Sequence, residues 1–195
     1  MSKSVTAVVN ALKSSGAIPD VIPQSFTPSI NFNVFWPSKG KEATIGEALS
    51  KESTQEEPEI KVLPTDGPGG TDANATYTMV MTDPDAPSRQ DPKWGQFRHW
   101  VLPGLKLPAG GSLQAQKTKP AATPYMGPAP PPGSGFHRYI FLLFQEPAGG
   151  LSLPTDATES SGGEKSRPKW NAMTFAERNQ LKLVGATFFQ TEVKE

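Results

Sequence analysis

The apolar residues of this chain come in short runs that are separated by long segments rich in glycine and proline. The most regular run, His137 to Gln145, contains the longest uninterrupted apolar stretch, Tyr139 to Phe144. Apolar runs of this length between turn residues are typical of strands. Five other segments have the same character: Ile30 to Trp36, Ile60 to Leu63, Thr76 to Thr82, Phe97 to Leu102 and Leu183 to Glu192. The chain is therefore predicted to be mostly β, with one sheet packed on another.

Two small helices are predicted beside the strands. Near the N-terminus, apolar residues recur at helical spacing: Val5, Val8, Val9 and Leu12. The helix they predict ends before Gly16, and we expect its apolar stripe to pack on the body of the domain, although a terminal helix could instead engage a partner. A second helix is predicted to begin at Thr174, where the side chains of Thr174 and Glu177 form a capping box, and to end near Lys182.

Three long connections contain little periodicity. Lys39 to Glu59 is polar and is predicted to be a mobile surface loop with at most one helical turn. Pro103 to Gly135 and Pro147 to Lys169 are the other two, and loops of this length in compact domains are usually functional or disordered. Prolines gather between Tyr125 and Gly135, so this part is predicted to form a stiff, extended wall.

The length and composition exclude several classes of protein. At 195 residues the chain is long enough for one good core, so we expect residues 1–195 to form a single domain. The net charge is zero, which argues against a nucleic-acid-binding protein. There is no cysteine, which excludes disulfides and thiol catalysis. No segment has the pattern of a signal peptide or a membrane span, so a cytoplasmic protein is expected.

The segment from Asp83 to Arg89 (DPDAPSR) is the most informative motif. Its two carboxylates, Asp83 and Asp85, would lean the same way on an extended backbone, and the neighbouring prolines stiffen the loop around them. Both histidines of the chain follow in similar short motifs, His99 and His137. Two acids, two histidines and a tyrosine in three short motifs predict one polar pocket.

The strand pattern predicts which side chains share a face. On the later strand, His137 and Tyr139 are expected to point together, with Arg138 on the opposite face. On the earlier strand, the alternation places one set of residues on one face: Phe97, His99 and Val101. Each histidine alone could also sit, fully hydrogen-bonded, at a strand edge or in a core.

Four kinds of chemistry fit such a cluster. A serine hydrolase needs its nucleophile at a strand-to-helix turn, whereas Ser134 leads into a strand. Two histidines and a carboxylate could ligate zinc or iron, but their spacing fits no helical ligand pair. Asp83 and Asp85 are too close in sequence to flank a glycosidic bond. The fourth possibility is non-catalytic binding of a small polar or anionic group.

Anion binding has a clear physical basis in these residues. A carboxylate that accepts one ring N–H of a histidine fixes its tautomer and leaves the other nitrogen for the ligand. A protonated histidine can donate a charge-assisted hydrogen bond to a phosphate oxygen. An unpaired aspartate would repel phosphate. We therefore expect at least one acid to pair with a histidine or with a cationic part of the ligand.

These motifs resemble those of the phosphatidylethanolamine-binding protein (PEBP) family. The resemblance is carried by the segment from Asp83 to Arg89, by Arg98-His99-Trp100 and by the segment from Gly135 to Tyr139 (GFHRY). It extends from about Ala17 to the C-terminus. Within the family the chain is most similar to the fungal carboxypeptidase Y inhibitor branch, through YMGPAPP from Tyr125, RPKW from Arg167 and FFQTE from Phe188.

The resemblance implies an antiparallel β-sandwich with a small pocket for phosphate or a phospholipid head group, and no cofactor, metal or catalytic activity. It implies a role as a serine carboxypeptidase inhibitor or a signalling modulator, with residues 1–16 as a candidate inhibitory arm. No polybasic segment is present, so membrane attachment is expected to be weak. The implied ligand-binding residues are Asp83, Asp85, His99, Gly127, Ala129, Pro130, Pro131, His137 and Tyr139.

Overall fold

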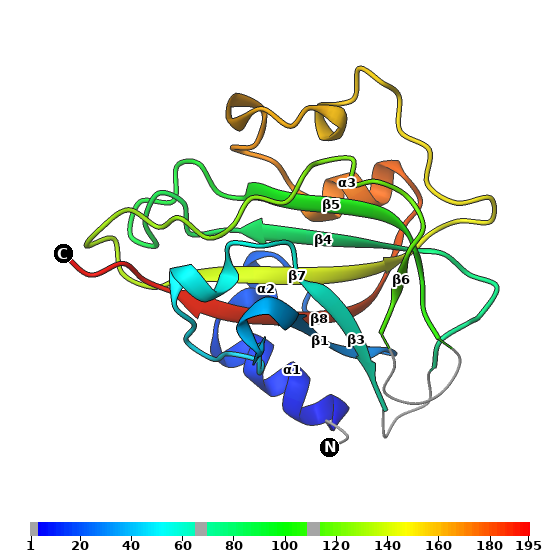
Figure 1. The fold of residues 1–195 in the computed structure, drawn as a ribbon, viewed down its shortest axis with the longest axis horizontal. Coiled ribbons are helices and arrows are strands. Elements are labelled where there is room, and N and C mark those ends of the chain that lie inside the picture. Colours follow the sequence, from blue (N-terminus) through cyan, green and yellow to red (C-terminus); the bar gives the residue numbers. More distant parts are fainter. Residues whose placement is uncertain (1–3, 65–69, 109–113) are drawn as a thin grey trace.

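The computed structural model describes residues 4–64, 70–108 and 114–195, and contains two antiparallel sheets (Figure 1). The smaller sheet has the strand order β2-β1-β3, and the larger has the order β6-β5-β4-β7-β8. The strands are β1 (Asn31–Trp36), β2 (Lys41–Glu42), β3 (Glu59–Leu63), β4 (Tyr77–Asp83), β5 (Phe97–Lys106), β6 (Gln116–Lys117), β7 (His137–Gln145) and β8 (Lys182–Thr191). The helices are α1 (Val5–Ser14), α2 (Ala17–Asp20) and α3 (Ala172–Arg178), and the short 3-10 turns are η1 (Pro37–Lys39), η2 (Lys51–Thr54), η3 (Thr158–Ser160) and η4 (Glu164–Ser166). The predicted mostly β fold, with sheet on sheet, is confirmed.

The larger sheet is buried on both faces. Alternate residues of β7, among them Tyr139 and Phe141, pack in a core shared with the smaller sheet. The residues between them, among them Ile140 and Leu142, pack in a second core with the three helices. Because both faces meet apolar layers, β7 reads in the sequence as a continuous apolar run rather than an alternation.

The N-terminal helix α1 packs on the second core, as its apolar stripe predicts. Val8 is 4% exposed and Leu12 is fully buried, whereas Val5 and Val9 are half-buried. The remaining residues of the predicted arm, 1–3, lie outside the described residues.

The predicted end of β5 at Leu102 is wrong. Proline lacks the N–H that a central strand needs, which favoured a strand end before Pro103. In the structure the strand continues to Lys106, because its register with β4 shifts between Tyr77 and Met79 and Gly104 adopts a left-handed φ of 71°. The connection predicted from Pro103 therefore begins later and also contains β6, while its residues 109–113 lie outside the described part.

A second irregularity in β5 corrects the predicted faces. The register with β4 pairs Trp100 with Met81 and Arg98 with Thr82, which leaves His99 as an extra residue in a bulge. Val101 consequently packs in the core on the helix side, and His99 does not share its face. Strict alternation had placed His99 and Val101 on one face, because nothing in the sequence indicates the bulge.

The predicted start of the last helix is also wrong. The N-cap of α3 is Asn171, whose side-chain oxygen accepts the N–H of Thr174 at 2.8 Å. Thr174 itself lies inside the helix, which ends at Arg178 rather than near Lys182. Asn and Thr are both good N-caps, and the earlier of the two is used.

The polar segment from Lys39 to Glu59 contains one 3-10 turn, η2, as expected, and the short strand β2, which was not predicted. Thr54 at the end of η2 is fully buried, so the segment is packed on the body of the protein rather than projecting from it. Among the described residues no helix is both long and apolar enough to cross a membrane.

Candidate functional site

The three sequence motifs converge on one cavity of about 360 Å3. Asp83 at the end of β4, His99 in the bulge of β5, and His137 and Tyr139 at the start of β7 all line it. The Tyr139 ring lies edge-on to His99 at a centroid distance of 5.2 Å and is stacked with His137 at 6.4 Å. The structure brings both imidazoles, the phenol and Asp83 together, whereas Asp85, the second acid of the prediction, does not line this cavity.

His137 is the centre of a hydrogen-bonded chain. Its Nδ1 lies 2.8 Å from Asp83 Oδ2, and its Nε2 lies 3.0 Å from Ser134 Oγ. The Ser134 oxygen also lies 2.7 Å from the carbonyl oxygen of Pro131. A hydroxyl has one hydrogen and can donate it to only one acceptor. The Ser134 hydroxyl can therefore donate either to the Pro131 carbonyl or to His137 Nε2, and both ring nitrogens of His137 have a partner within the protein.

Hydrogen bonds link Ser134, His137 and Asp83 in the same way as the three residues of a serine hydrolase triad. Ser134 lies in the loop before β7, whereas the nucleophile of such enzymes lies at a strand-to-helix turn. The expectation that one acid pairs with a histidine is confirmed for Asp83.

His99 also uses one ring nitrogen within the protein, and its pKa is lowered. Its Nδ1 lies 2.7 Å from the carbonyl oxygen of Met126, which therefore accepts the Nδ1 hydrogen. Burial lowers the pKa of His99, and the charge of Asp83 opposes this only in part. The neutral ring turns Nε2 into an acceptor, available to a ligand that carries a hydrogen-bond donor.

Tyr139 supplies a hydroxyl that stays protonated. Burial raises the pKa of Tyr139, and the nearby carboxylate of Asp83 raises it further. A hydrogen bond from the Ala129 backbone opposes these effects. The phenol therefore offers a neutral donor to the cavity at any physiological pH.

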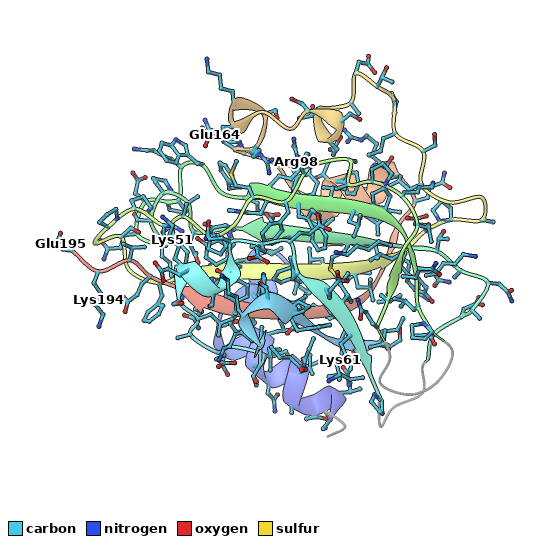
Figure 2. The ribbon with its side chains drawn as sticks, in the orientation of Figure 1. Lys51, Lys61, Arg98, Glu164, Lys194 and Glu195 are labelled. Atoms are coloured by element: carbon cyan, nitrogen blue, oxygen red, sulfur yellow. The ribbon has the colours of Figure 1, made fainter. Side chains whose placement is uncertain are left out.

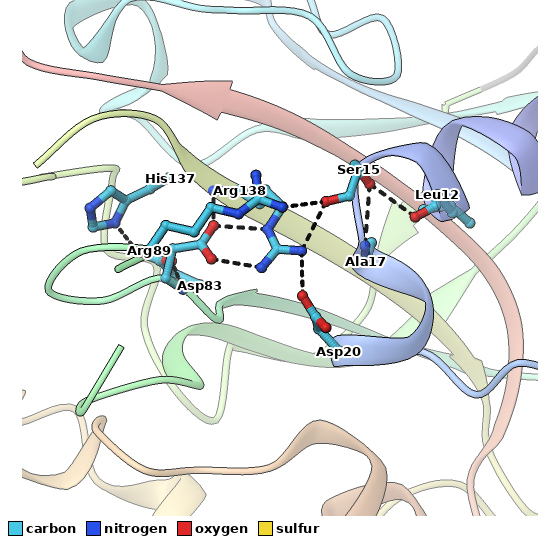
Figure 3. Close-up of polar contacts among 9 residues, drawn as sticks. Leu12, Ser15, Ala17, Asp20, Asp83, Arg89, His137 and Arg138 are labelled. Carbon is cyan, nitrogen blue, oxygen red and sulfur yellow. Dashed lines mark hydrogen bonds and ion pairs between the residues drawn. The ribbon is translucent and has the colours of Figure 1, made fainter. Parts of the chain in front are cut away.

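Asp85 is placed differently from what its spacing suggests. The strand ends at Asp83 and the chain turns at Pro84, where the Asp85 N–H donates to Asp83 Oδ1 at 2.7 Å. The Asp85 carboxylate faces the other side of the loop and binds Arg138 through Nε at 2.9 Å and Nη2 at 2.6 Å. Figure 3 shows Arg138 extending from β7 toward Ser15 and Asp20. The prediction that the two acids share a side is wrong, because the extended backbone it assumed ends between them.

The predicted wall from Gly127 to Pro131 lines the cavity only in part. Ala129 and Pro131 line it, whereas Gly127 and Pro130 do not. Gly127 packs against Gln55, and a Cβ at this position would lie 2.8 Å from the Gln55 side chain. Gln55 also donates to the carbonyl oxygen of Pro128 at 2.8 Å, so the wall is held from its outer side.

One wall of the cavity was not predicted. It comes from the connection before α3, with Glu164, Lys165 and Pro168. Arg98 holds this segment through the carbonyl of Thr158 at 2.7 Å, and Figure 2 shows Arg98 beneath it and Glu164 upon it. Burial lowers the pKa of Arg98 to about 10. The RPKW motif was a signal for this wall, but its position next to the cavity depends on tertiary contacts.

Apolar side chains complete the rim of the cavity, and they were not predicted as site residues either: Ala86, Pro87, Trp94, Phe97 and Met126. Trp94 is 45% exposed, which is unusual for so large an apolar side chain. Within the described residues, no group of three or more histidine, cysteine, aspartate or glutamate side chains is placed to hold a metal ion.

The family follows from comparison with known proteins. A family model described as phosphatidylethanolamine-binding protein matches residues 39–189, which include every residue of the cavity. The chain belongs to the PEBP family. Its two antiparallel sheets and its converging motifs are thus the fold and the cavity of a PEBP member.

Individual members of the family are similar to this chain in sequence and in structure. It is 35% identical to the carboxypeptidase Y inhibitor of Saccharomyces cerevisiae, with 96% of each chain covered. Its structure is similar to that of carboxypeptidase Y inhibitor in complex with the cognate proteinase, with a TM-score of 0.77, 31% identity and 97% of each chain covered. It is also similar to the phosphatidylethanolamine-binding protein from Plasmodium vivax, with a TM-score of 0.75, 26% identity, and 96% and 98% of the chains covered.

Proposed function

We propose that this protein inhibits a serine carboxypeptidase without itself acting as an enzyme. The observation that carries the proposal is the similarity to the S. cerevisiae carboxypeptidase Y inhibitor over 96% of both chains. The similarity extends to the inhibitor in its complex with the proteinase, where 97% of each chain is covered. The part that contacts a protease can therefore be sought along almost the whole chain.

The N-terminal segment, residues 1–16, is the proposed inhibitory arm. Its helix α1 buries Val8 and Leu12 on the body of the protein and exposes its other side, including Ala7 and Asn10. At its C-terminal end, the carbonyl oxygen of Ser15 accepts from Arg89 at 2.7 Å and from Arg138 at 3.0 Å. An arm that is already ordered loses little conformational entropy on binding, which favours affinity.

A truncation tests the arm. Deletion of residues 1 to 4 removes the segment before α1 and leaves Val8 and Leu12 in place. We expect inhibition of purified yeast carboxypeptidase Y to weaken by about 100-fold or more, the scale of losing the dominant contact of an interface. Thermal unfolding should be unchanged, and Lys182→Ala, an exposed position on β8, serves as the control. Full inhibition by the truncated chain would remove residues 1 to 4 from the proposed arm and leave only α1.

The cavity is proposed to bind phosphate or a phospholipid head group. The support is the set of polar side chains around it: the imidazole of His137, the phenol of Tyr139 and the ammonium of Lys165. His99, as a neutral acceptor, suits a ligand that also carries a donor, such as the ammonium of an ethanolamine head group.

Calorimetric titration tests the cavity. We expect inorganic phosphate and glycerophosphoethanolamine to bind the wild type and to bind His137→Ala about tenfold or more weakly, because a charge-assisted hydrogen bond is lost. Asp83→Asn tests the partner of His137, and Asp91→Asn, an exposed acid of the same loop, is its matched control. Unchanged affinities in both cavity variants would overturn the assignment. A protein that binds these ligands but never inhibits the protease would instead be a head-group-binding protein without an inhibitory role.

A further inference from the structure

A second cavity lies on the reverse side of the loop that carries Asp83. It has a volume of about 600 Å3, within the range of small-molecule sites. Its walls come from α2, from the loop between β4 and β5, from Arg138 of β7 and from the RPKW motif. The charged residues that line it are Asp20, Asp85, Arg89, Arg138 and Lys169, and the others are Pro84, Pro92, Gly95, Gln96, Trp170 and Asn171.

Both acids of this cleft bind the same arginine. Asp85 is 1% exposed, and its two carboxylate oxygens accept from Arg138. Asp20 accepts from Nη1 of the same arginine at 2.8 Å. Arg138 is thus shared by two carboxylates, and burial, which by itself would lower its pKa, is outweighed by Asp85, so that its pKa is raised. The cleft therefore holds one cation more than it holds acids.

Among the described residues, Arg89 and Lys169 are the two cations of the cleft that form no ion pair with a carboxylate. Arg89 uses Nη2 for the Ser15 carbonyl, which leaves further N–H donors on its guanidinium. In the part of the chain that the structure describes, the Lys169 ammonium has no hydrogen-bond or ion-pair partner. Two cationic side chains with free donors thus line one cavity.

The backbone holds Lys169 firmly in this place. Its φ of 57° is left-handed, which is uncommon for a residue other than glycine. The Lys169 N–H donates to the carbonyl of Trp94 at 2.9 Å, and the Trp170 N–H donates to that of Gln96 at 2.9 Å. The left-handed turn lets consecutive residues pair with the facing loop, so the backbone of Lys169 is held at the edge of the cleft and its exposed side chain starts from a fixed position.

We propose that this reverse-side cleft is a second binding site, for a small organic anion whose phosphate or carboxylate is held by Arg89 and Lys169. The volume exceeds that of a bare inorganic ion, and Pro92 and Trp170 offer apolar walls for the body of the ligand. Asn171 adds a polar side chain beside the two cations. The site is separate from the histidine cavity, because the Asp83 to Asp85 turn lies between them and presents one acid to each side.

An NMR titration of 15N-labelled protein tests the cleft. The probes are glycerol 3-phosphate and succinate, with sodium chloride at matched ionic strength as the control. We expect saturable shifts of the amide signals of Gln96, Lys169 and Asn171. A stronger response to glycerol 3-phosphate assigns a phosphate ester as the ligand, and a stronger response to succinate assigns a carboxylate.

Two matched lysine variants separate the sites. Lys169→Met keeps an unbranched side chain on the same left-handed backbone and should weaken the cleft response at least about tenfold, as should Arg89→Met. Lys165→Met, whose lysine lines the histidine cavity, should leave the cleft response unchanged. The inference is overturned if the cleft amides do not shift beyond the sodium chloride control, or if they shift equally in wild type and Lys169→Met. Shifts around His137 in the same experiment report on the histidine cavity, so failure of one site does not imply failure of the other.

Discussion

Asp83 and Asp85 are two residues apart, and yet their carboxylates face opposite sides of the loop that carries them. Asp83 lines the histidine cavity and pairs with a histidine, whereas Asp85 faces the reverse-side cleft and pairs with an arginine. Their partners are consecutive residues of β7, His137 and Arg138, which point to opposite faces of the strand. The turn between the acids matches this alternation, so each carboxylate meets its own partner.

The comparison shows how one motif can serve structure and binding at once. The pair formed by Asp85 and Arg138 is closed, since both oxygens and most donors are used within the protein. The pair formed by Asp83 and His137 is open, because a single hydrogen bond joins the two side chains and the other ring nitrogen contacts only the half-buried Ser134 hydroxyl. A closed buried pair stabilises the fold only while both partners are present, and an open pair can exchange a weak internal contact for a ligand.

The largest expected effect is on the closed pair. Arg138→Met leaves Asp85 as an uncompensated buried charge and should lower the free energy of unfolding by about 3–5 kcal/mol, measured by urea unfolding. His137→Ala should cost less, about 1–3 kcal/mol, because only one hydrogen-bonded partner of Asp83 is lost. The double variant Arg138→Met with Asp85→Leu is the control and should recover part of the loss. Equal destabilisation by Arg138→Met and His137→Ala would erase the distinction between the two pairs.

A smaller effect is expected from pH on the histidine cavity. Burial lowers the pKa of His99 below its unfolded value of about 6.5, so the unfolded chain takes up the proton first as the pH falls. The contribution of His99 to stability is therefore complete above about pH 6.5 and declines below it, by at most about 1.4 kcal/mol per pH unit.

Urea unfolding between pH 5 and pH 8 measures this dependence. In His99→Gln, the part of the pH dependence that comes from His99 should be absent. Sulfate, whose charge is constant over this range, should offset part of the loss, because a protonated ring can donate from Nε2 to an anion in the cavity. A wild-type pH profile identical to that of His99→Gln would contradict the assignment.

The smallest effect is expected from Asp20, an exposed acid that binds the arginine of the closed pair. Asp20 binds Arg138, but its side chain is 48% exposed, so solvent screens the interaction. Asp20→Asn should change stability by less than about 1 kcal/mol and protease inhibition by less than about fivefold, in the same unfolding and inhibition assays. A larger loss of inhibition with unchanged stability would show that Asp20 positions the arm rather than merely bordering it.

Local patterns in the sequence were sufficient for much of the fold. The run from His137 to Gln145 was predicted with the bounds that β7 has, and the helical stripe that includes Val8 and Leu12 packs on the body as expected. Buried side chains recur at regular intervals along a helix or strand, so the spacing of apolar residues predicts which of them are buried. The departures occur at bulges and caps, such as His99 in β5 and Asn171 before α3, where one extra or earlier residue changes the outcome without changing the pattern.

The sequence by itself determined the strands, the amphipathic helix and the short motifs that bring two histidines, an acid and a tyrosine to one cavity. Only the tertiary structure decided which acid faces that cavity, which residues close its last wall, and that a second cleft exists behind the loop. The physical reason is distance along the chain. Asp85 and Arg138 are 53 residues apart, and Lys169 meets the carbonyl of Trp94 only after the sheet has formed. Contacts of this kind depend on register and turns, which local composition does not encode.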